Sequence, residues 1–229
     1  MTITSKLEEE LKAELALIEE RGLTRKIKNL RFIDPVRAID EGGKEYLVFS
    51  SNNYLGLTHA PEVIQAAKEA NNYGTGSGGA RLTTGGHFEA SILEKKLADF
   101  KHTEKALILN TGYMTNLGVL YGLVKPNDVI FSDELNHASI IDGAKISKAT
   151  VKVYKHADVA DLERLLHEDA THGNRFIITD GVFSMDGDIA PLPALVKLAE
   201  KYEATLIVDD AHAVGVIGED GSGTAAHFG

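Results

Sequence analysis

Hydrophobic and polar positions alternate with two different periods along this chain. In the first part, Leu7, Leu11, Leu15 and Ile18 recur every three or four residues among Glu and Lys, which is the spacing of one helical face. This pattern predicts an amphipathic helix over residues 4–21. A helix of this length is only marginally stable alone, so we expect it to dock on another surface.

From about residue 44 onward, short apolar runs alternate with longer segments of helical periodicity. Such alternation favours a mostly parallel sheet flanked by helices on both faces, with ligands bound at the carboxyl ends of the strands. The predicted fold class is therefore α/β. The expected strands are 46–49, 106–109, 129–131, 151–154, 176–179 and 205–208, and the expected helices are 61–70, 90–100, 115–123, 158–167 and 193–202.

Composition removes several classes of function. The 24 Lys and Arg against 34 Asp and Glu give a net charge of −10 without a basic cluster, which argues against a nucleic-acid partner. The absence of cysteine excludes disulfides, thiolate zinc sites and a cysteine nucleophile, and is compatible with a reducing cytosol. No apolar run approaches the ~20 residues of a membrane span, and the acidic N-terminus is unlike a signal peptide. We expect a cytoplasmic protein with no membrane partner.

Familiar motifs for dinucleotides and metals fit poorly. Gly74, Gly76 and Gly79 have the spacing G-x-G-x-x-G, but they follow a helix and not a strand, so a dinucleotide site is disfavoured. His167 and His172 are five residues apart and would diverge on a helix. We therefore expect no metal site.

Polar residues follow four of the predicted strands. A Gly turn at Gly112 leads into a helix start that suits a phosphate, while His137 and Ser184 follow the next two such strands. Asp209 and His212 follow the last strand, where a carboxylate needs a cation such as a protonated pyridine nitrogen. Each segment alone has an ordinary structural explanation, but four at one sheet edge indicate a binding site.

A glycine loop supplies the most distinctive local composition. Residues 74–86 contain six glycines and one arginine, Arg81, so bare backbone can approach a ligand or a partner chain closely.

These segments resemble the α-oxoamine synthases, fold-type I enzymes that use pyridoxal 5′-phosphate (PLP) to condense an amino acid with an acyl-CoA. The matching stretches are 50–56, 74–86, 133–143, 179–188 and 208–215. The resemblance implies a fold-type I PLP-dependent transferase. It implies an N-terminal helix and arm over residues 1–45, and a large PLP-binding domain over residues 46–229 without the family's smaller C-terminal domain.

Within this family, residues 76–85 are most similar to the biotin-pathway members that join L-alanine to pimeloyl-CoA or its carrier-protein ester. Residues 133–143 and 179–215 are equally similar to members that act on glycine and acetyl-CoA. We favour the first pair of substrates, because Arg81 could bring a guanidinium to a carboxylate-bearing acyl chain.

The resemblance also implies roles for individual residues. Asp209 would pair with the pyridinium nitrogen of PLP, and His137 would stack on the ring and orient the reacting groups. The other implied contacts are Ser184 and His212 with the ring hydroxyl, Thr111, Gly112 and Tyr113 with the phosphate, and Arg25 and Asn52 with substrate carboxylates. His137, Asp209 and His212 are thus the expected catalytic residues. Lys26, Lys28 and Arg31 offer positive charge for the anionic CoA.

One feature of the family is not matched. Its Schiff-base lysine lies in a Ser-Lys motif beyond the Asp-x-x-His motif, and this sequence stops before that position. We therefore expect residues 1–229 to be inactive by themselves and to belong to a longer polypeptide.

Two chains share each active site in this family, so we expect a homodimer with the glycine loop and N-terminal helix at its interface.

Two other functions are alternatives to a PLP-dependent condensing enzyme. One is a catalytically incomplete PLP-fold subunit with a structural or regulatory role, and the other is a nicotinamide oxidoreductase.

Overall fold

The computed structural model describes residues 5–229, which divide into two compact units, with the boundary in the sequence between Ala70 and Asn71. We call them the N-terminal unit and the sheet unit. The predicted domain boundary after residue 45 follows the family resemblance and stays a prediction. Among residues 5–229, no helix is long and apolar enough to cross a membrane.

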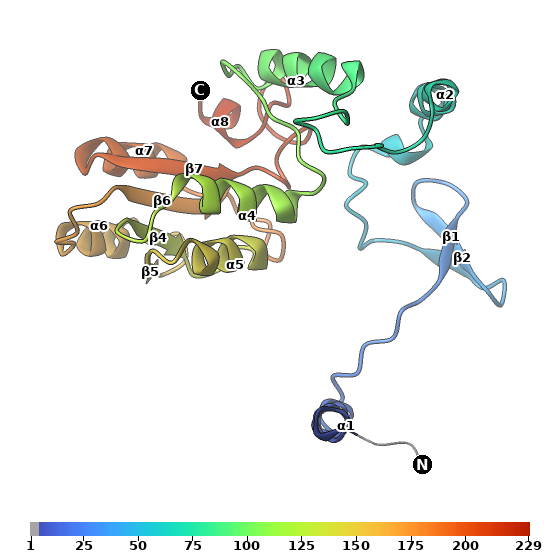
Figure 1. The fold of residues 1–229 in the computed structure, drawn as a ribbon, viewed down its shortest axis with the longest axis horizontal. Helices are drawn as coiled ribbons and strands as arrows, with labels where there is room; N and C mark the ends of the chain where they lie inside the picture. The colour runs from blue at the N-terminus through green and yellow to red at the C-terminus, as the bar shows by residue number, and fades with distance from the viewer. Residues whose placement is uncertain (1–4) are drawn as a thin grey trace. The chain divides into compact units, whose positions relative to one another are not determined.

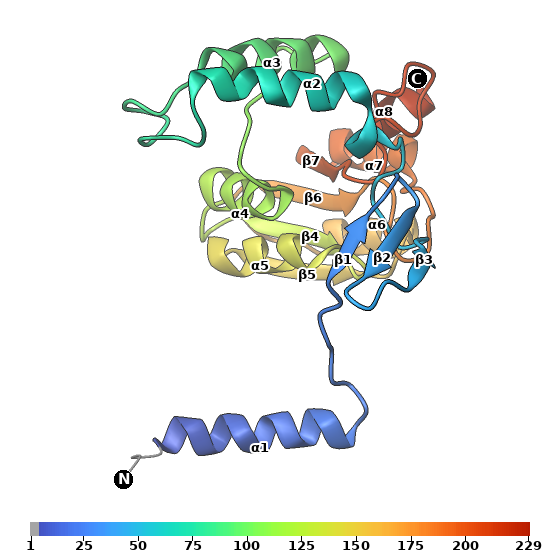
Figure 2. The ribbon, with the colours of Figure 1, turned by 90° about the vertical axis from the view of Figure 1, so that its right-hand side faces the viewer.

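The N-terminal unit contains a small antiparallel sheet. Its strands β1 (Leu30–Phe32), β2 (Arg37–Asp40) and β3 (Glu45–Leu47) lie in that order, as Figure 2 shows. The run predicted at 46–49 was therefore wrongly assigned to the parallel sheet. The helices are α1 (Lys6–Glu20), the 3₁₀ turn η1 (Leu57–His59) and α2 (Pro61–Ala70).

Helix α1 confirms the amphipathic helix expected near the N-terminus. Ser5 caps it, with its hydroxyl oxygen accepting a hydrogen bond from the Glu8 N–H at 3.2 Å. Its apolar stripe, which includes Leu7, Leu11 and Leu15, is at least half exposed. Docking of this stripe stays a prediction.

The sheet unit is built on four parallel strands. They are β4 (Val129–Asp133), β5 (Thr150–Tyr154), β6 (Arg175–Asp180) and β7 (Ala204–Asp209), in the order β5-β4-β6-β7 (Figure 1). Four of the predicted strands are thereby confirmed. The helical elements of this unit are η2 (Asn71–Tyr73), α3 (Phe88–Phe100), α4 (Gly112–Leu123), α5 (Ala138–Ser147), α6 (Val159–His167), α7 (Leu192–Lys201) and α8 (Thr224–Phe228).

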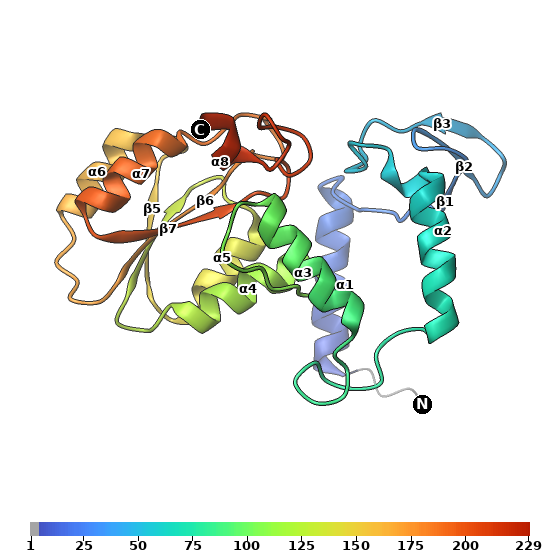
Figure 3. The ribbon, with the colours of Figure 1, turned by 90° about the horizontal axis from the view of Figure 1, so that it is seen from above.

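The side chains of successive strand residues pack into two separate hydrophobic cores, one on each face of the sheet. Phe131 and Ile177 pack with α6 and α7, whereas Ile130 and Ile178 pack with α4 and α5. Figure 3 shows the two helix pairs on opposite faces of the sheet. Because both faces are covered, the strands are nearly continuous apolar runs, and each large buried side chain contributes about 1.5–3 kcal/mol.

Residues 106–109 do not form the predicted strand. Instead of joining a ladder, the Ile108 N–H donates to the Glu94 carboxylate at 2.8 Å, and its carbonyl accepts from the Arg81 guanidinium at 3.1 Å. These side chains satisfy the backbone groups that a strand would otherwise pair. Helix α5 was missed because its sequence was interpreted as a polar segment after β4.

Candidate active site

Three aspartates end neighbouring strands at the carboxyl edge of the parallel sheet. Asp133 ends β4, while Asp180 and Asp209 end β6 and β7 and are partners in the register. Burial, together with the negative charge of Asp209, raises the pKa of Asp180 to about 6. A cation at this edge would relieve the repulsion between the carboxylates.

Asp209 is held by hydrogen bonds on both of its carboxylate oxygens. Oδ2 accepts from Asn116 Nδ2 of helix α4 at 2.7 Å, and Oδ1 accepts from the Ala211 N–H at 3.0 Å. The side chain is half-buried beside the start of α4. Its donors are neutral, so the negative charge is not balanced by these contacts.

The carboxylate of the adjacent Asp210 is bound by residues from other elements of the sheet unit. Its Oδ2 accepts from Lys101 Nζ at 2.6 Å, and both oxygens accept from the Thr224 N–H at 3.2 Å. Lys101 also donates to the Ser222 carbonyl at 2.5 Å. Asp210 therefore ties β7 to α3 and to the loop before α8.

In the part of the chain that the structure describes, no group of three or more His, Asp or Glu side chains could hold a metal ion.

We expect Lys101→Met to lower the free energy of unfolding by about 1.5–3 kcal/mol, because the partly buried Asp210 carboxylate would lose its cation. Urea unfolding measures this. Lys95→Met is the matched control on α3, the helix that Lys101 directly follows, since Lys95 forms an exposed pair with Asp99 worth below about 0.5 kcal/mol. Equal losses in the two variants would contradict the structural role of Lys101.

His137 lies at the N-cap of α5. Its backbone N–H donates to Asp180 Oδ2 at 2.9 Å, while its ring Nδ1 lies 2.7 Å from the Ser139 hydroxyl. The side chain is exposed at the same edge as Asp209. This position is compatible with contact to a ligand.

The first turn of α4 offers backbone donors. Thr111 caps the helix by accepting from the Met114 N–H at 3.1 Å, and the N–H groups of Gly112 and Tyr113 precede the first helical hydrogen bond. The Tyr113 hydroxyl donates to the Asp142 carboxylate on α5, and this hydrogen bond raises the pKa of the phenol. Tyr113 can therefore offer a ligand its backbone N–H rather than its hydroxyl.

Ser184 and His212 lie where the sequence predicts them, beyond the carboxyl ends of β6 and β7. Ser184 is exposed in a loop closed by the hydrogen bond from the Phe183 N–H to the Asp188 carbonyl at 3.0 Å. His212 is half-buried in the turn after β7. Their contacts with a cofactor stay predictions.

Arg25 and Asn52 belong to the N-terminal unit. Arg25 is exposed, and the side-chain oxygen of Asn52 accepts from the Tyr54 hydroxyl at 3.4 Å. Their contacts with a substrate stay predictions.

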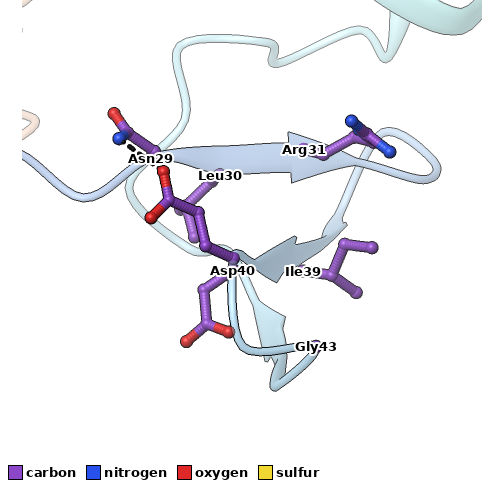
Figure 4. A pocket seen from close by; sticks show the side chains of 7 residues that line it. Asn29, Leu30, Arg31, Ile39, Asp40 and Gly43 are labelled. Carbon is purple, nitrogen blue, oxygen red and sulfur yellow. Dashed lines mark hydrogen bonds between the residues drawn. The ribbon is translucent and has the colours of Figure 1, made fainter.

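The N-terminal unit has a cavity of about 450 Å³ near β1 and β2. Figure 4 shows Arg31 apart from Asp40 at its wall. Asp40 and Glu41 outnumber this guanidinium, so the cavity is poorly suited to an anion such as CoA. It is lined by Asn29, Leu30, Arg31, Ile39, Asp40, Glu41 and Gly43.

The glycine loop is closely packed, but its arginine is already paired. A Cβ on Gly85 would lie 1.8 Å from the Gly79 carbonyl oxygen, so a side chain cannot be accommodated there. The Arg81 guanidinium forms a 2.7 Å ion pair with Glu94 and donates to the Ile108 carbonyl. The expected use of Arg81 for an acyl carboxylate is therefore not supported.

His156, which no sequence motif indicates, joins two aspartates. His156 lies between Asp133, 3.0 Å from Nδ1, and Asp188, 2.7 Å from Nε2. Burial alone would lower the pKa of His156, but the two hydrogen bonds together raise it. This ion pair links the end of β4 to the loop that carries Ser184.

Because its folded-state pKa is raised, protonated His156 stabilises the protein fully below about pH 6.5, the ordinary pKa of histidine. That stabilisation is lost as the pH rises through the folded-state value. We expect His156→Gln to lower the thermal midpoint more at about pH 6 than at about pH 9. His172→Gln, at an exposed position, is the control. The same decrease at both pH values would exclude a charged His156.

Comparisons with known proteins show the family of this chain. A family model for aminotransferase class I and II matches residues 44–227. The 8-amino-7-oxononanoate synthase of Lysinibacillus sphaericus is 51% identical over 224 residues, which are 97% of this chain and 57% of that protein. This chain thus spans little more than half the length of that relative.

Solved structures give the same result. Serine palmitoyltransferase from S. paucimobilis with bound PLP–myriocin has a TM-score of 0.88 at 33% identity, covering 100% of this chain and 58% of that one. The 8-amino-7-oxononanoate synthase of Francisella tularensis has a TM-score of 0.67 at 34% identity, covering 79% of this chain and 49% of that one. These matches confirm the α/β fold expected from the sequence. The chain belongs to the aminotransferase class I and II family.

Proposed function

We propose that this chain carries the PLP-binding part of an enzyme that condenses L-alanine with a pimeloyl thioester, the 8-amino-7-oxononanoate synthase reaction of biotin biosynthesis. The observation that carries the proposal is the Asp209 carboxylate, held by neutral donors at the carboxyl edge of the sheet, near the first turn of α4. The substrate class comes from the name of the relative that is 51% identical.

The groups at this edge fit PLP. The N–H groups of Gly112 and Tyr113 at the positive end of α4 suit a phosphate. The Asp209 carboxylate suits a protonated ring nitrogen, and the two aspartates that end β6 and β7 leave an excess of negative charge for such a cation. When bound, PLP supplies an electron sink for the negative charge that develops at the α-carbon of the amino acid.

The residues of this chain then have separate tasks. Asp209 holds the proton on the ring nitrogen, and His137 packs on the ring and orients the amino acid against the acyl group. Ser184 and His212 donate hydrogen bonds to the ring hydroxyl oxygen. Arg25 and Asn52 bind substrate carboxylates.

The assembly proposed for the whole protein is a cytoplasmic homodimer. The exposed apolar stripe of α1 supports an interface, because an apolar helix face of this kind is stabilised by covering it. The lysine that binds PLP covalently in the family would come from the rest of a polypeptide as long as its relatives.

Competition between substrate pairs tests the proposed reaction. In the polypeptide extended to the length of its relatives, alanine with pimeloyl-CoA should give a kcat/KM at least about tenfold above that of glycine with acetyl-CoA. CoA release and the product masses report both reactions. A higher kcat/KM for the glycine pair would move the assignment to a glycine acetyltransferase, which the sequence left as the alternative.

A further inference from the structure

A continuous hydrogen-bond chain joins the two proposed cofactor-contacting residues, Asp209 and His137. Asn116 Nδ2 lies 2.7 Å from Asp209 Oδ2 and 2.8 Å from the Ser139 hydroxyl oxygen. The same hydroxyl lies 2.7 Å from His137 Nδ1. Asn116 lies on α4 and Ser139 on the facing helix α5.

The direction of each hydrogen bond in this series follows from the ionised Asp209 carboxylate at one end. An ionised carboxylate can only accept, so the amide atom of Asn116 beside Asp209 must be the NH₂ group. Its second hydrogen is donated to the Ser139 oxygen. The Ser139 hydroxyl hydrogen is then left to donate to His137 Nδ1.

A second donor faces the same histidine nitrogen. The backbone N–H of Ser139 points at His137 Nδ1 from 3.3 Å. With two donors directed at it, Nδ1 must carry the lone pair, and the proton of the neutral ring must lie on Nε2. The series of hydrogen bonds from Asp209 to His137 therefore fixes one tautomer of His137.

Close packing of the two helices makes this chain possible. A Cβ on Gly143 of α5 would lie 2.9 Å from Leu120 Cδ1 and 3.1 Å from the Asn116 carbonyl oxygen, both on α4. Ser139 lies one turn before Gly143 on the same helix face and is 1% exposed. The bond from the His137 N–H to Asp180 fixes the start of α5.

We infer that Asn116 is a positioning residue that orients the Asp209 carboxylate and, through Ser139, sets the tautomer of His137. The inference rests on the proposed function, because the two groups it joins are those proposed to contact PLP. A neutral amide orients Asp209 without supplying positive charge, so the carboxylate stays available to a ring nitrogen. His137 presents its Nε2–H to the ligand as a donor.

Nitrogen NMR of the ¹⁵N-labelled chain without ligand tests the direction of the bonds. Long-range ¹H–¹⁵N correlation separates the two tautomers, and His137→Gln identifies the His137 signals among the nine histidines. At a pH where the ring is neutral, we expect only the Nε2–H form in the unvaried chain. Asn116→Ala and Ser139→Ala should each add a measurable Nδ1–H fraction. Either an Nδ1–H form in the unvaried chain or a tautomer that neither variant changes would overturn the inference.

Asn174→Ala is the matched control, because Asn174 donates an equivalent bond to Asp128 at the opposite end of the sheet, at 3.2 Å. It should leave the tautomer of His137 unchanged. Circular dichroism checks the fold of each variant, and Ser139→Ala serves if Asn116→Ala does not fold. A change of tautomer in the control would also count against the inference, since it would show that the signal reports general loosening.

PLP titrations of the same variants, made in the polypeptide extended to the length of its relatives, test the link to the proposed function. Asn116→Ala should weaken PLP binding about tenfold, and less than about twofold when Asp209→Asn is already present. An equal loss in both backgrounds would contradict action through Asp209. If the unvaried extended polypeptide binds no PLP at millimolar concentration while the tautomer changes as expected, the proposed function fails and the inference stands.

Discussion

Replacing Asp209 with asparagine should slow exchange of the substrate α-proton by about 100-fold or more while PLP remains bound. The two side chains have the same shape, but the amide carries no charge to keep a ring nitrogen protonated. Asp209 already accepts a hydrogen bond on each oxygen, from Asn116 and from the Ala211 N–H. The side-chain NH₂ group of an asparagine would therefore also face one of these two donors. Deuterium exchange at the α-carbon of alanine measures the effect in the polypeptide extended to the length of its relatives.

Asp99→Asn, at an exposed position on α3, is the matched control and should leave the exchange unchanged. Asp210→Asn would be a poor control, because Asp210 binds Lys101 and Thr224. Near-normal exchange in Asp209→Asn would remove Asp209 from the proposed site.

The second large effect is expected for His137→Phe. Phenylalanine keeps an aromatic face for stacking but loses the ring nitrogens, including the one held by Ser139. PLP affinity should stay within about threefold, whereas condensation should fall by about 100-fold because the reacting groups lose an orienting hydrogen bond. Absorbance titration with PLP and CoA release measure the two quantities.

His172→Phe, in an exposed turn, controls for the added hydrophobic ring. If turnover in His137→Phe matches that of the unvaried enzyme, the role of His137 is limited to capping α5.

The parallel sheet was predictable because its residues satisfy both local and global requirements. In β4 and β6, residues such as Phe131, Ile177 and Ile178 are buried on both faces, so each run is strongly apolar and easy to find. The carboxyl ends of parallel strands meet at one edge, which also made the positions of His137 and Asp209 predictable. The family motifs supported the same conclusion.

Other features depend on contacts between residues far apart in the sequence. Residues 106–109 have a strand-like composition, but side chains of Arg81 and Glu94 satisfy the backbone of Ile108. The adjacent Asp209 and Asp210 differ only in the partners that the fold brings to them. Pattern and spacing contain no information about such partners.

Asn116 illustrates the same limit within the candidate site. A single asparagine inside an expected helix has no distinctive pattern, and its importance depends on Ser139 and Asp209 reaching it from other elements. The spacing of α4 and α5 around Gly143 allows this approach, and helical periodicity does not reveal it.

A crystal structure of the polypeptide extended to the length of its relatives, with PLP bound, shows whether Asp209 contacts the cofactor. We expect the ring nitrogen within hydrogen-bond distance of the Asp209 carboxylate, and the phosphate on the N–H groups of Gly112 and Tyr113. The His137 ring should contact the face of the cofactor. A ring nitrogen directed away from Asp209, or PLP bound only in the cavity beside Arg31, would contradict the proposed site.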